Sequence, residues 1–307
     1  MPRLEAEIGR LLREKGLTLG TVESATGGLI SHMITNVAGS SDYYVGSVTS
    51  YSNDVKIKLV GVKAGTIARY GAVSGDVARQ MAAGGRRVLG ADVCVADTGI
   101  AGPGGATPGK PVGLFYLGLA NAKGTYSRRH VFAGTRLQRK QAAAEAVIEW
   151  LRQYLLTGLV EQPVVSCFLE SGGRVLILRR SGRVGTYQGK WAAVSGYLDG
   201  EPEEQAFTEI EDETGLHGRR LLLVRKGEAL TVDDAAIGIR WLVHPFLFHT
   251  DKPRRVRTDW ESVEALWIDP SEIAQYDTVP GLREALALVW PRAVTRAGDR
   301  GGRSGTA

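Results

Sequence analysis

Apolar positions in the first half of the chain follow two alternating spacings. Leu4, Ile8, Leu11 and Leu12 recur at the spacing of a helix that buries one face. Short apolar runs predict strands over residues 18–23, 44–51, 91–97, 112–120 and 126–132, and helical spacing predicts helices over 28–36, 73–88 and 136–155. Strands that alternate with helices are typical of a layered α/β domain.

The second half opens with a different pattern. Two apolar runs, 164–170 and 174–180, flank a Ser-Gly-Gly turn and predict a β-hairpin. A helix is predicted over 202–214, where Pro202 suits the first turn and Gly215 suits the position after the last. Further strands are predicted over 219–226, 237–248 and 263–268, and a final helix over 280–290. These elements predict a second layered α/β domain with a mixed sheet.

The chain has 307 residues, about twice the length of a typical domain. The periodic pattern breaks at Gly and Pro residues between 156 and 163, which predicts a linker over 158–163. We therefore expect two α/β/α sandwich domains, over 1–157 and 164–290. Residues 291–307 are rich in Gly and Arg and are expected to be disordered, because they offer little apolar surface to bury.

Composition narrows the class of protein. The chain is 43% hydrophobic and 23% charged, as in ordinary globular proteins, and no stretch approaches the ~18 apolar residues of a membrane span. Acidic residues near the N-terminus argue against a secretory signal, and Cys94 and Cys167 lie in separate apolar runs, which argues against a disulfide framework. These features predict a cytoplasmic protein. The net charge of +5 comes from scattered Lys and Arg, so no nucleic-acid or membrane partner is expected.

Residues 21–30 pass from a predicted strand through a turn of small residues into a predicted helix. Such a turn aims a side chain out from the carboxyl end of the strand, and its backbone N–H groups can bind a phosphate or an oxyanion. Ser24 lies at this turn. Taken alone, Ser and Thr at this place are equally typical of a helix cap.

Further motifs follow in a fixed order. They are ESATGG at 23–28, YSNDVK at 51–56, GAVS at 71–74, TGIAGPGG at 98–105, KPVG at 110–113 and FAGTR at 132–136. Together they resemble the C-terminal domain of the competence-damage-inducible CinA family, also called the PncC nicotinamide-mononucleotide deamidases. The resemblance covers residues 3–155. It implies hydrolysis of the carboxamide of nicotinamide mononucleotide to nicotinate mononucleotide and ammonia, without a cofactor.

The resemblance implies roles for individual residues. Ser24 corresponds to the family's serine, Lys56 to its lysine and Tyr51 to its motif tyrosine. A lysine whose pKa is lowered by partial burial can take the proton of a serine hydroxyl, and the turn N–H groups would then stabilise the oxyanion. Arg136 suits a phosphate clamp. The other expected substrate-binding residues are Thr26, Gly27, Gly28, Thr98, Gly99, Gly102 and Gly104. Without the family, Lys56 would be interpreted as a solvated lysine like Lys58.

The predicted helix at 202–214 carries a second candidate site. Glu209, Asp212 and Glu213 are spaced i, i+3 and i+4, so their carboxylates share one face of the helix. Three like charges repel one another unless a cation lies between them, and Mg²⁺ or Mn²⁺ prefers oxygen ligands. The alternative is a solvated acidic face, which is our interpretation of Glu203, Glu204 and Glu211.

Residues 163–290 resemble the Nudix hydrolases, through the Gly-Lys-Trp sequence at 189–191, the acidic helix and the sequence EALWIDP at 264–270. The resemblance implies Glu209, Asp212 and Glu213 as metal ligands, a backbone carbonyl of Gly196 as a further ligand, and metal-assisted attack of water on a pyrophosphate. The chain departs from the Nudix signature, because Thr208 replaces an Arg, Asp212 replaces a Glu, and the segment after Gly196 is shorter. Loops 181–190 and 227–236 would set the substrate.

The two resemblances together predict a bifunctional pyridine-nucleotide recycling hydrolase. Cleavage of NAD(H) or an ADP-ribose type of substrate by the Nudix half would release small nucleotides, including the substrate of the deamidase half. Two alternatives remain open: a non-catalytic nucleotide-sensing or competence-associated protein, and a deamidase whose Nudix half acts on unrelated nucleotides. The expected partners are small-molecule nucleotides, and family likeness suggests a homo-oligomer formed through the first domain.

Overall fold

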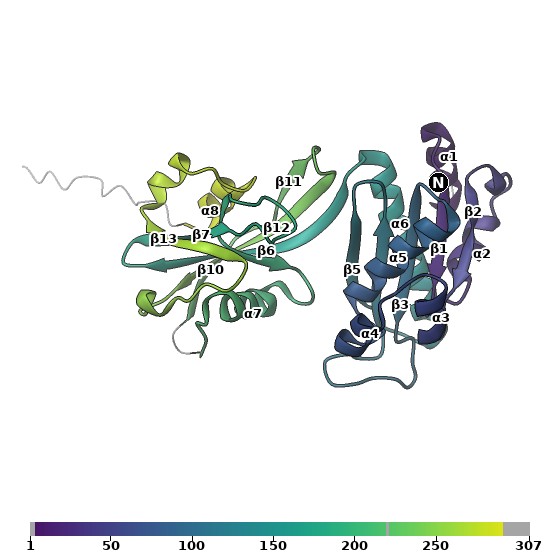
Figure 1. Ribbon diagram of the computed structural model, residues 1–307, viewed down its shortest axis with the longest axis horizontal. Helices are drawn as coiled ribbons and strands as arrows, with labels where there is room; N and C mark the ends of the chain where they lie inside the picture. Colours follow the sequence, from purple (N-terminus) through teal and green to yellow (C-terminus); the bar gives the residue numbers. More distant parts are fainter. Residues whose placement is uncertain (1–3, 219–220, 291–307) are drawn as a thin grey trace, which may run out of the picture. The chain divides into compact units, whose positions relative to one another are not determined.

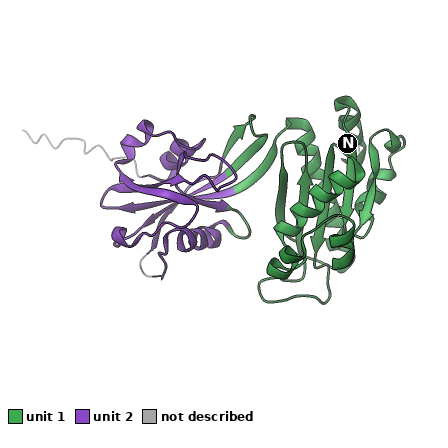
Figure 2. Ribbon diagram, in the orientation of Figure 1, with its two compact units in different colours: residues 1–163, 197–201, 231–242 green, residues 164–196, 202–230, 243–307 purple. Residues whose placement is uncertain are grey.

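The computed structural model describes residues 4–218 and 221–290. It divides into two compact units (Figure 2). Unit 1 comprises residues 1–163, 197–201 and 231–242, and unit 2 comprises the remainder. The tail at 291–307, which we expected to be disordered, lies outside the described residues. No helix in the described part of the chain is long and apolar enough to cross a membrane.

Unit 1 contains a five-stranded sheet in the order β2-β1-β3-β4-β5 (Figure 1). Its strands are β1 (Leu19–Glu23), β2 (Tyr44–Thr49), β3 (Val93–Gly99), β4 (Leu114–Ala120) and β5 (Thr125–Val131). Strands β2 and β3 both run parallel to β1, whereas β4 is antiparallel to β3 and β5 is antiparallel to β4. All residues of β1 and β4 are buried, which requires that both faces of the sheet be covered.

Helices cover the sheet of unit 1. They are α1 (Leu4–Lys15), α2 (Leu29–Thr35), α3 (Asn53–Lys58), α4 (Ala64–Tyr70), α5 (Gly75–Leu89) and α6 (Arg136–Thr157), together with the short 3₁₀ helix η1 (Ser40–Asp42). Helix α5 packs against all five strands, and α6 packs against β3 and β4 together with α1 and α2 (Figure 1). The result is the predicted layering of helices around a sheet.

Local sequence signals explain the ends of the two longest helices. Ser74 and Thr135 cap α5 and α6 by accepting a backbone N–H with the side-chain oxygen, and Gln138 completes a capping box with Thr135. Gly158 ends α6 in the left-handed conformation, with φ of 72°. The strong helix signals of 73–88 and 136–155 therefore correspond to real helices.

The second sheet has eight strands, with the path β10-β12-β6-β7-β13 and with β11, β8 and β9 paired beside it. Its strands are β6 (Val160–Ser171), β7 (Arg174–Arg180), β8 (Trp191–Ala192), β9 (Val194–Tyr197), β10 (Leu222–Lys226), β11 (Leu230–Asp234), β12 (Ile239–His249) and β13 (Ser262–Ile268). Its helices are α7 (Pro202–Thr214) and α8 (Leu282–Val289), with the 3₁₀ helices η3 (Pro253–Arg255) and η4 (Pro270–Gln275). Figure 1 shows α7 and α8 on opposite faces of this sheet.

The structure confirms the predicted α/β class and most predicted elements. Three differences stand out. Helices α3 and α4 lie in a stretch for which no helix was predicted, and β11 lies within the predicted loop 227–236. Strand β6 begins at Val160, inside the predicted linker 158–163.

Candidate functional sites

The first candidate site lies at the carboxyl ends of three parallel strands. Ser24 follows β1, Ser50 and Tyr51 follow β2, and Thr98 lies near the end of β3. The N–H of Ser50 donates to the carbonyl of Glu23 at 2.8 Å, so the β1–β2 pairing extends up to the site. Ligands of open α/β sheets bind beside such strand ends, where neighbouring connections diverge.

Lys56 reaches Ser24 from the short helix α3. This helix begins at Asn53, and the side chain of Ser52 caps it by accepting the N–H of Val55 at 3.2 Å. The Nζ atom of Lys56 donates to Oγ of Ser24 at 2.9 Å. Lys56 is only 2% exposed, whereas the side chain of Lys58 on the same helix is 76% exposed. The interpretation of Lys56 as a solvated lysine is therefore wrong.

The surroundings of Lys56 suit a neutral amine. Its Nζ also contacts the carbonyls of Ser50 at 2.7 Å and Tyr51 at 3.2 Å. A neutral amine would donate its two protons to these carbonyls and keep its lone pair for the hydroxyl of Ser24. Burial lowers the pKa of Lys56 below its ordinary 10.5, while the nearby charge of Asp97 acts in the opposite direction.

Most N–H groups of the Ser24 turn already have partners within the protein. The carboxylate of Asp97 accepts the N–H groups of Ser24 at 3.0 Å, Ala25 at 2.9 Å and Thr26 at 3.2 Å, and also the hydroxyl of Thr26. These three N–H groups do not face a ligand, contrary to our expectation that the turn would stabilise the oxyanion. The sequence analysis missed Asp97. The signal that could have revealed it is a carboxylate within an otherwise mostly apolar predicted strand.

A second buried carboxylate, Glu23, holds the start of α2. It accepts the N–H groups of Gly28 at 2.8 Å, Ile30 at 3.0 Å and Ser31 at 2.8 Å. Gly27 and Gly28 adopt φ of 62° and 96°, which only glycine enters without strain, so this turn depends on both. The polar groups of the predicted substrate residues Thr26 and Gly28 therefore bind the protein's own carboxylates and stabilise the turn. Gly27 is exposed beside them.

The remaining predicted substrate residues lie on α6, at the end of β3 and in the loop that follows β3. Arg136 donates to the carbonyl of Gly102 at 2.6 Å and lies 3.4 Å from the hydroxyl of Tyr51, whose side chain is exposed. Thr98 is buried and its hydroxyl donates to Ala72 at 2.9 Å. Gly99 ends β3, and Gly104 is exposed in the following loop.

Lys140 is a further basic residue beside the Ser24 turn that the sequence analysis missed. It lies one helical turn after Arg136 on α6, and its Nζ is 3.6 Å from the position that a Cβ on Gly27 would occupy. The spacing of Arg136 and Lys140 was visible in the sequence, but only the fold brings α6 beside the Ser24 turn.

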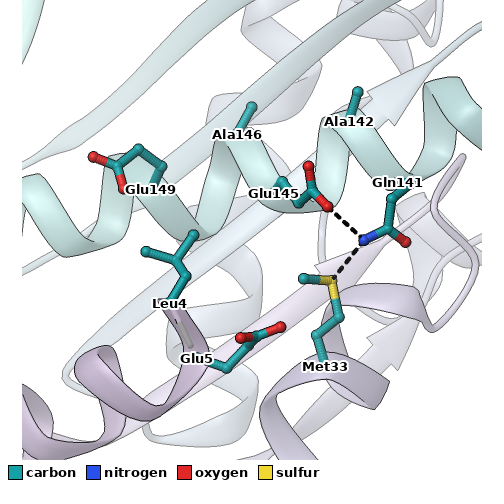
Figure 3. A pocket seen from close by; sticks show the side chains of 8 residues that line it. All are labelled: Leu4, Glu5, Met33, Gln141, Ala142, Glu145, Ala146 and Glu149. Carbon is teal, nitrogen blue, oxygen red and sulfur yellow. Dashed lines mark hydrogen bonds between the residues drawn. The ribbon is translucent and has the colours of Figure 1, made fainter. Parts of the chain in front are cut away.

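A separate cavity of about 640 Å³ lies between α1, α2 and α6 (Figure 3). Leu4, Met33 and Ala146 contribute apolar surface, and Glu145 on the same wall accepts a hydrogen bond from Gln141 at 2.7 Å. None of the predicted site residues lines this cavity.

The second candidate site lies on α7. Glu213 is buried and accepts the N–H of Ser195 at 2.9 Å, and Glu209 accepts the side-chain amide of Gln205 at 2.7 Å. A Cβ added to Gly196 would lie 1.9 Å from Oε1 of Glu209, so the Glu209 carboxylate lies directly on the backbone of Gly196. The structure therefore brings three of the four predicted metal-site residues together. The fourth, Asp212, is exposed on the adjoining part of the helix.

Electrostatics identifies two more acids at this site. Burial raises the pKa of Glu213 to about 8, and the charges of Glu209, Glu261 and Asp259 add to the effect. The pKa of Glu209 is raised in the same way. Asp259 and Glu261 were not predicted, because they reach α7 only through the fold.

The carboxylate oxygens at this site are the ligands that Mg²⁺ and Mn²⁺ prefer, and a divalent cation would offset their mutual repulsion. Within residues 4–218 and 221–290, no three His, Cys, Asp or Glu side chains converge closely enough to hold an ion as they stand. The donor chemistry thus fits a divalent cation, but the side chains would have to turn toward it.

Two family models match the chain, one over each half. The CinA C-terminal domain family matches residues 1–155, and the NUDIX domain family matches residues 160–289. A CinA-like protein of Geobacter sulfurreducens is 48% identical over 154 residues, which cover 50% of this chain and 37% of that protein. The chain therefore spans less than half the length of the curated relatives it matches.

Two solved structures are similar to the two parts of the chain. A CinA superfamily protein of Klebsiella pneumoniae is 28% identical with a TM-score of 0.49, covering 50% of this chain and 96% of its own. A MutT protein of Methanosarcina mazei is 20% identical with a TM-score of 0.34, covering 41% of this chain and 91% of its own. The chain belongs to the CinA C-terminal domain family and carries a NUDIX domain over residues 160–289.

Proposed function

We propose that residues 1–157 form a serine-dependent amidohydrolase that converts nicotinamide mononucleotide into nicotinate mononucleotide and ammonia. The observation that carries this proposal is the 2.9 Å contact between Nζ of the buried Lys56 and Oγ of Ser24. A buried amine beside a hydroxyl at a strand end is an arrangement that activates a serine nucleophile. Family membership is consistent with it, although the names of the relatives state no substrate.

The reaction follows from these contacts. Neutral Lys56 takes the proton of Ser24 while Oγ attacks the carboxamide carbon and forms a C–O bond. The C–N bond then breaks, and the proton held by Lys56 leaves with the nitrogen as ammonia. Water, activated by the same amine, hydrolyses the acyl-serine and releases the carboxylate product. No cofactor enters these steps.

The groups beside the Ser24 turn support binding of the rest of the nucleotide. Arg136 and Lys140 supply positive charge for the phosphate, and the exposed ring of Tyr51 supplies an aromatic surface for the pyridine. Gly27 and Gly104 are exposed and could offer backbone groups to the nucleotide, whereas Gly102 is buried. Thr98 and Gly99 set the end of β3 beneath them.

Ammonia release tests this proposal. The purified chain is incubated with nicotinamide mononucleotide, and ammonia and nicotinate mononucleotide are measured. We expect product from the wild type, none from Ser24→Ala, and a loss of at least about 100-fold in Lys56→Met. The matched control is Lys58→Met, because Lys58 is exposed on the same helix and should keep full activity. Absence of ammonia from the folded wild type, or full activity in Ser24→Ala, would overturn the proposal.

For the NUDIX domain we propose hydrolysis of a nucleoside diphosphate linked to another group, of the NAD(H) or ADP-ribose type. Glu209, Glu213 and the backbone of Gly196 would hold Mg²⁺ or Mn²⁺, with Asp212 beside them. When bound, the cation would polarise the pyrophosphate and lower the pKa of a water molecule. The chain's own carboxylates would orient that water. Together the two domains would act on successive pyridine nucleotides.

One observation favours a second candidate, in which the NUDIX domain binds nucleotides without cleaving them. Thr208, at the position where the Nudix signature has Arg, donates its hydroxyl to the carbonyl of Glu204 at 3.1 Å. It therefore leaves the metal-site carboxylates without a basic neighbour from this position. Incubation with Mg²⁺ and NADH, ADP-ribose or nucleoside triphosphates separates the two: cleaved products support hydrolysis, and tight binding without products supports the alternative. Self-association and a cytoplasmic location stay predictions.

A further inference from the structure

Asp97 lies beneath the serine turn, at the point where β3 approaches the end of β1. Its side chain is fully buried. It accepts the N–H groups of three consecutive residues, from Ser24 to Thr26, and the hydroxyl of Thr26 as well. Burying a carboxylate is costly unless its oxygens are fully hydrogen-bonded. The four hydrogen bonds therefore offset the cost of burying the charge of Asp97.

We propose that Asp97 is the positioning residue of the amidohydrolase site: its carboxylate fixes the turn that carries Ser24, and its negative charge acts on Lys56. This inference rests on the proposed role of Ser24 as the nucleophile. Asp97 itself does not touch the substrate.

The first part of the role is geometric. Oδ1 of Asp97 takes the N–H of Ser24, and Oδ2 takes those of Ala25 and Thr26. Three bonds to one planar group fix the backbone of these residues relative to β3. The Oγ atom of Ser24 is thereby held at 2.9 Å from Nζ of Lys56, which belongs to a different element, α3. A displacement of about 1 Å between reacting groups can cost about 100-fold in rate.

The second part is electrostatic. The charged groups that act on Asp97 or are acted on by it, in the described part of the chain, are Glu23 on β1 and Lys56 on α3. Burial raises the pKa of Asp97 to about 6, and the charge of Glu23 adds to this. When ionised, Asp97 favours the protonated form of Lys56 and so raises the pKa of that amine. Burial lowers the pKa of Lys56 and the charge of Asp97 opposes this, so Asp97 moves the pH range in which Lys56 becomes a neutral base upward.

The hydroxyl of Thr26 links the carboxylates of Glu23 and Asp97. The hydroxyl oxygen of Thr26 lies in hydrogen-bond contact with both Glu23, at 2.7 Å, and Asp97. A hydroxyl has a single proton and can donate to only one of them. If both contacts are hydrogen bonds, the one that the Thr26 hydroxyl does not donate must be donated by a protonated carboxyl group. Protonation of Asp97 is thus accommodated by the turn without loss of its contacts.

The test measures the reactivity of Ser24 without any nucleotide. Phenylmethylsulfonyl fluoride modifies activated serines, and mass spectrometry reports the rate of Ser24 labelling from about pH 5 to about pH 10. In the wild type the rate should rise with pH as Lys56 becomes neutral. Asp97→Asn keeps the shape but loses the charge and an acceptor, so we expect a plateau rate about 100-fold lower and a midpoint about one pH unit lower.

The matched control is Asp54→Asn, which removes an exposed carboxylate from the helix that carries Lys56. We expect it to label Ser24 as the wild type does. An unchanged rate and midpoint in Asp97→Asn would overturn the proposal. A lower rate with an unmoved midpoint would show a structural role alone and would overturn the electrostatic part.

Asp97→Asn could fail to fold, which circular dichroism would detect. Thr26→Val then serves as the second variant, because it removes one hydrogen bond to Asp97 and keeps the side-chain volume. Loss of that bond loosens the turn, whereas Asp97 stays ionised above its pKa of about 6, so we expect a lower plateau rate with an unmoved midpoint. A wild-type plateau rate in Thr26→Val would contradict the positioning role. Because labelling uses no nucleotide, these results are independent of whether nicotinamide mononucleotide is the substrate.

Discussion

Ser24 and Lys56 are separated by 32 residues in the sequence, yet the hydroxyl of one is hydrogen-bonded to the amine of the other at 2.9 Å. Ser24 is placed by the end of β1 and Lys56 by the buried face of α3. Because the amine also contacts two backbone carbonyls, its position does not depend on the serine. The pair is therefore set up before any substrate binds.

The pH dependence of amide hydrolysis follows from this pair. Only neutral Lys56 can accept the proton of Ser24, so activity should rise with pH through the pKa of Lys56. Burial lowers that pKa, so the midpoint should lie below 10.5. The measurement is kcat/KM for nicotinamide mononucleotide against pH, which reports groups of the free enzyme. A rate that falls as pH rises through this range would contradict the role of Lys56 as a base.

Comparison of sequence and structure shows where local signals suffice. Helix α7 runs from Pro202 to Thr214 as predicted, because Pro202 starts it and Gly215, with φ of 69°, follows its end. Helices α3 and α4 were missed because six or seven residues span about two helical turns and show the period only weakly, although α2, also seven residues long, was predicted. The position of Lys56 could thus be predicted only from the family resemblance.

Long-range contacts explain the rest of what the sequence could not predict. Glu209 and Glu213 share a face of one helix, so their spacing was enough to make them a candidate site. Asp259 and Glu261 act on the same carboxylates from a segment some 50 residues away, which no local pattern reveals. Asp97 likewise contacts Thr26, which lies 71 residues earlier in the sequence. The sequence analysis placed Asp97 in a predicted strand and gave its carboxylate no role.

Arg136 should act on the phosphate rather than on the amide. Arg136→Ala should raise KM for nicotinamide mononucleotide about tenfold or more, because a charge-assisted contact to the phosphate is lost, and should change kcat little. Nicotinamide riboside, which lacks the phosphate, should be hydrolysed equally by the variant and the wild type. Arg10→Ala, an exposed arginine on α1, is the control. Equal losses for both substrates would show that Arg136 does not bind the phosphate.

Glu213 should be essential to the NUDIX domain. Glu213→Gln removes a carboxylate that we expect to bind the cation, so Mg²⁺-dependent pyrophosphate hydrolysis should fall at least about 100-fold. Glu203→Gln, at an exposed position on the same helix, should leave it unchanged. Product analysis with NADH and ADP-ribose measures both. Unchanged turnover in Glu213→Gln would refute the assignment of this side chain to the metal site.

The packing of α5 in unit 1 depends on a glycine. A Cβ on Gly84 would lie 1.7 Å from the carbonyl oxygen of Val60, so Gly84→Ala must push the helix away from the segment after α3. We expect it to lower the free energy of unfolding by about 1–3 kcal/mol, the usual cost of overpacking. Gly65→Ala is the control, since Gly65 also lies in a helix, α4, but has open space around it. Alanine there should leave stability unchanged or raise it by up to about 1 kcal/mol. Urea denaturation measures both variants, and equal stabilities would mean that α5 and the segment after α3 are not packed as closely as the structure has them.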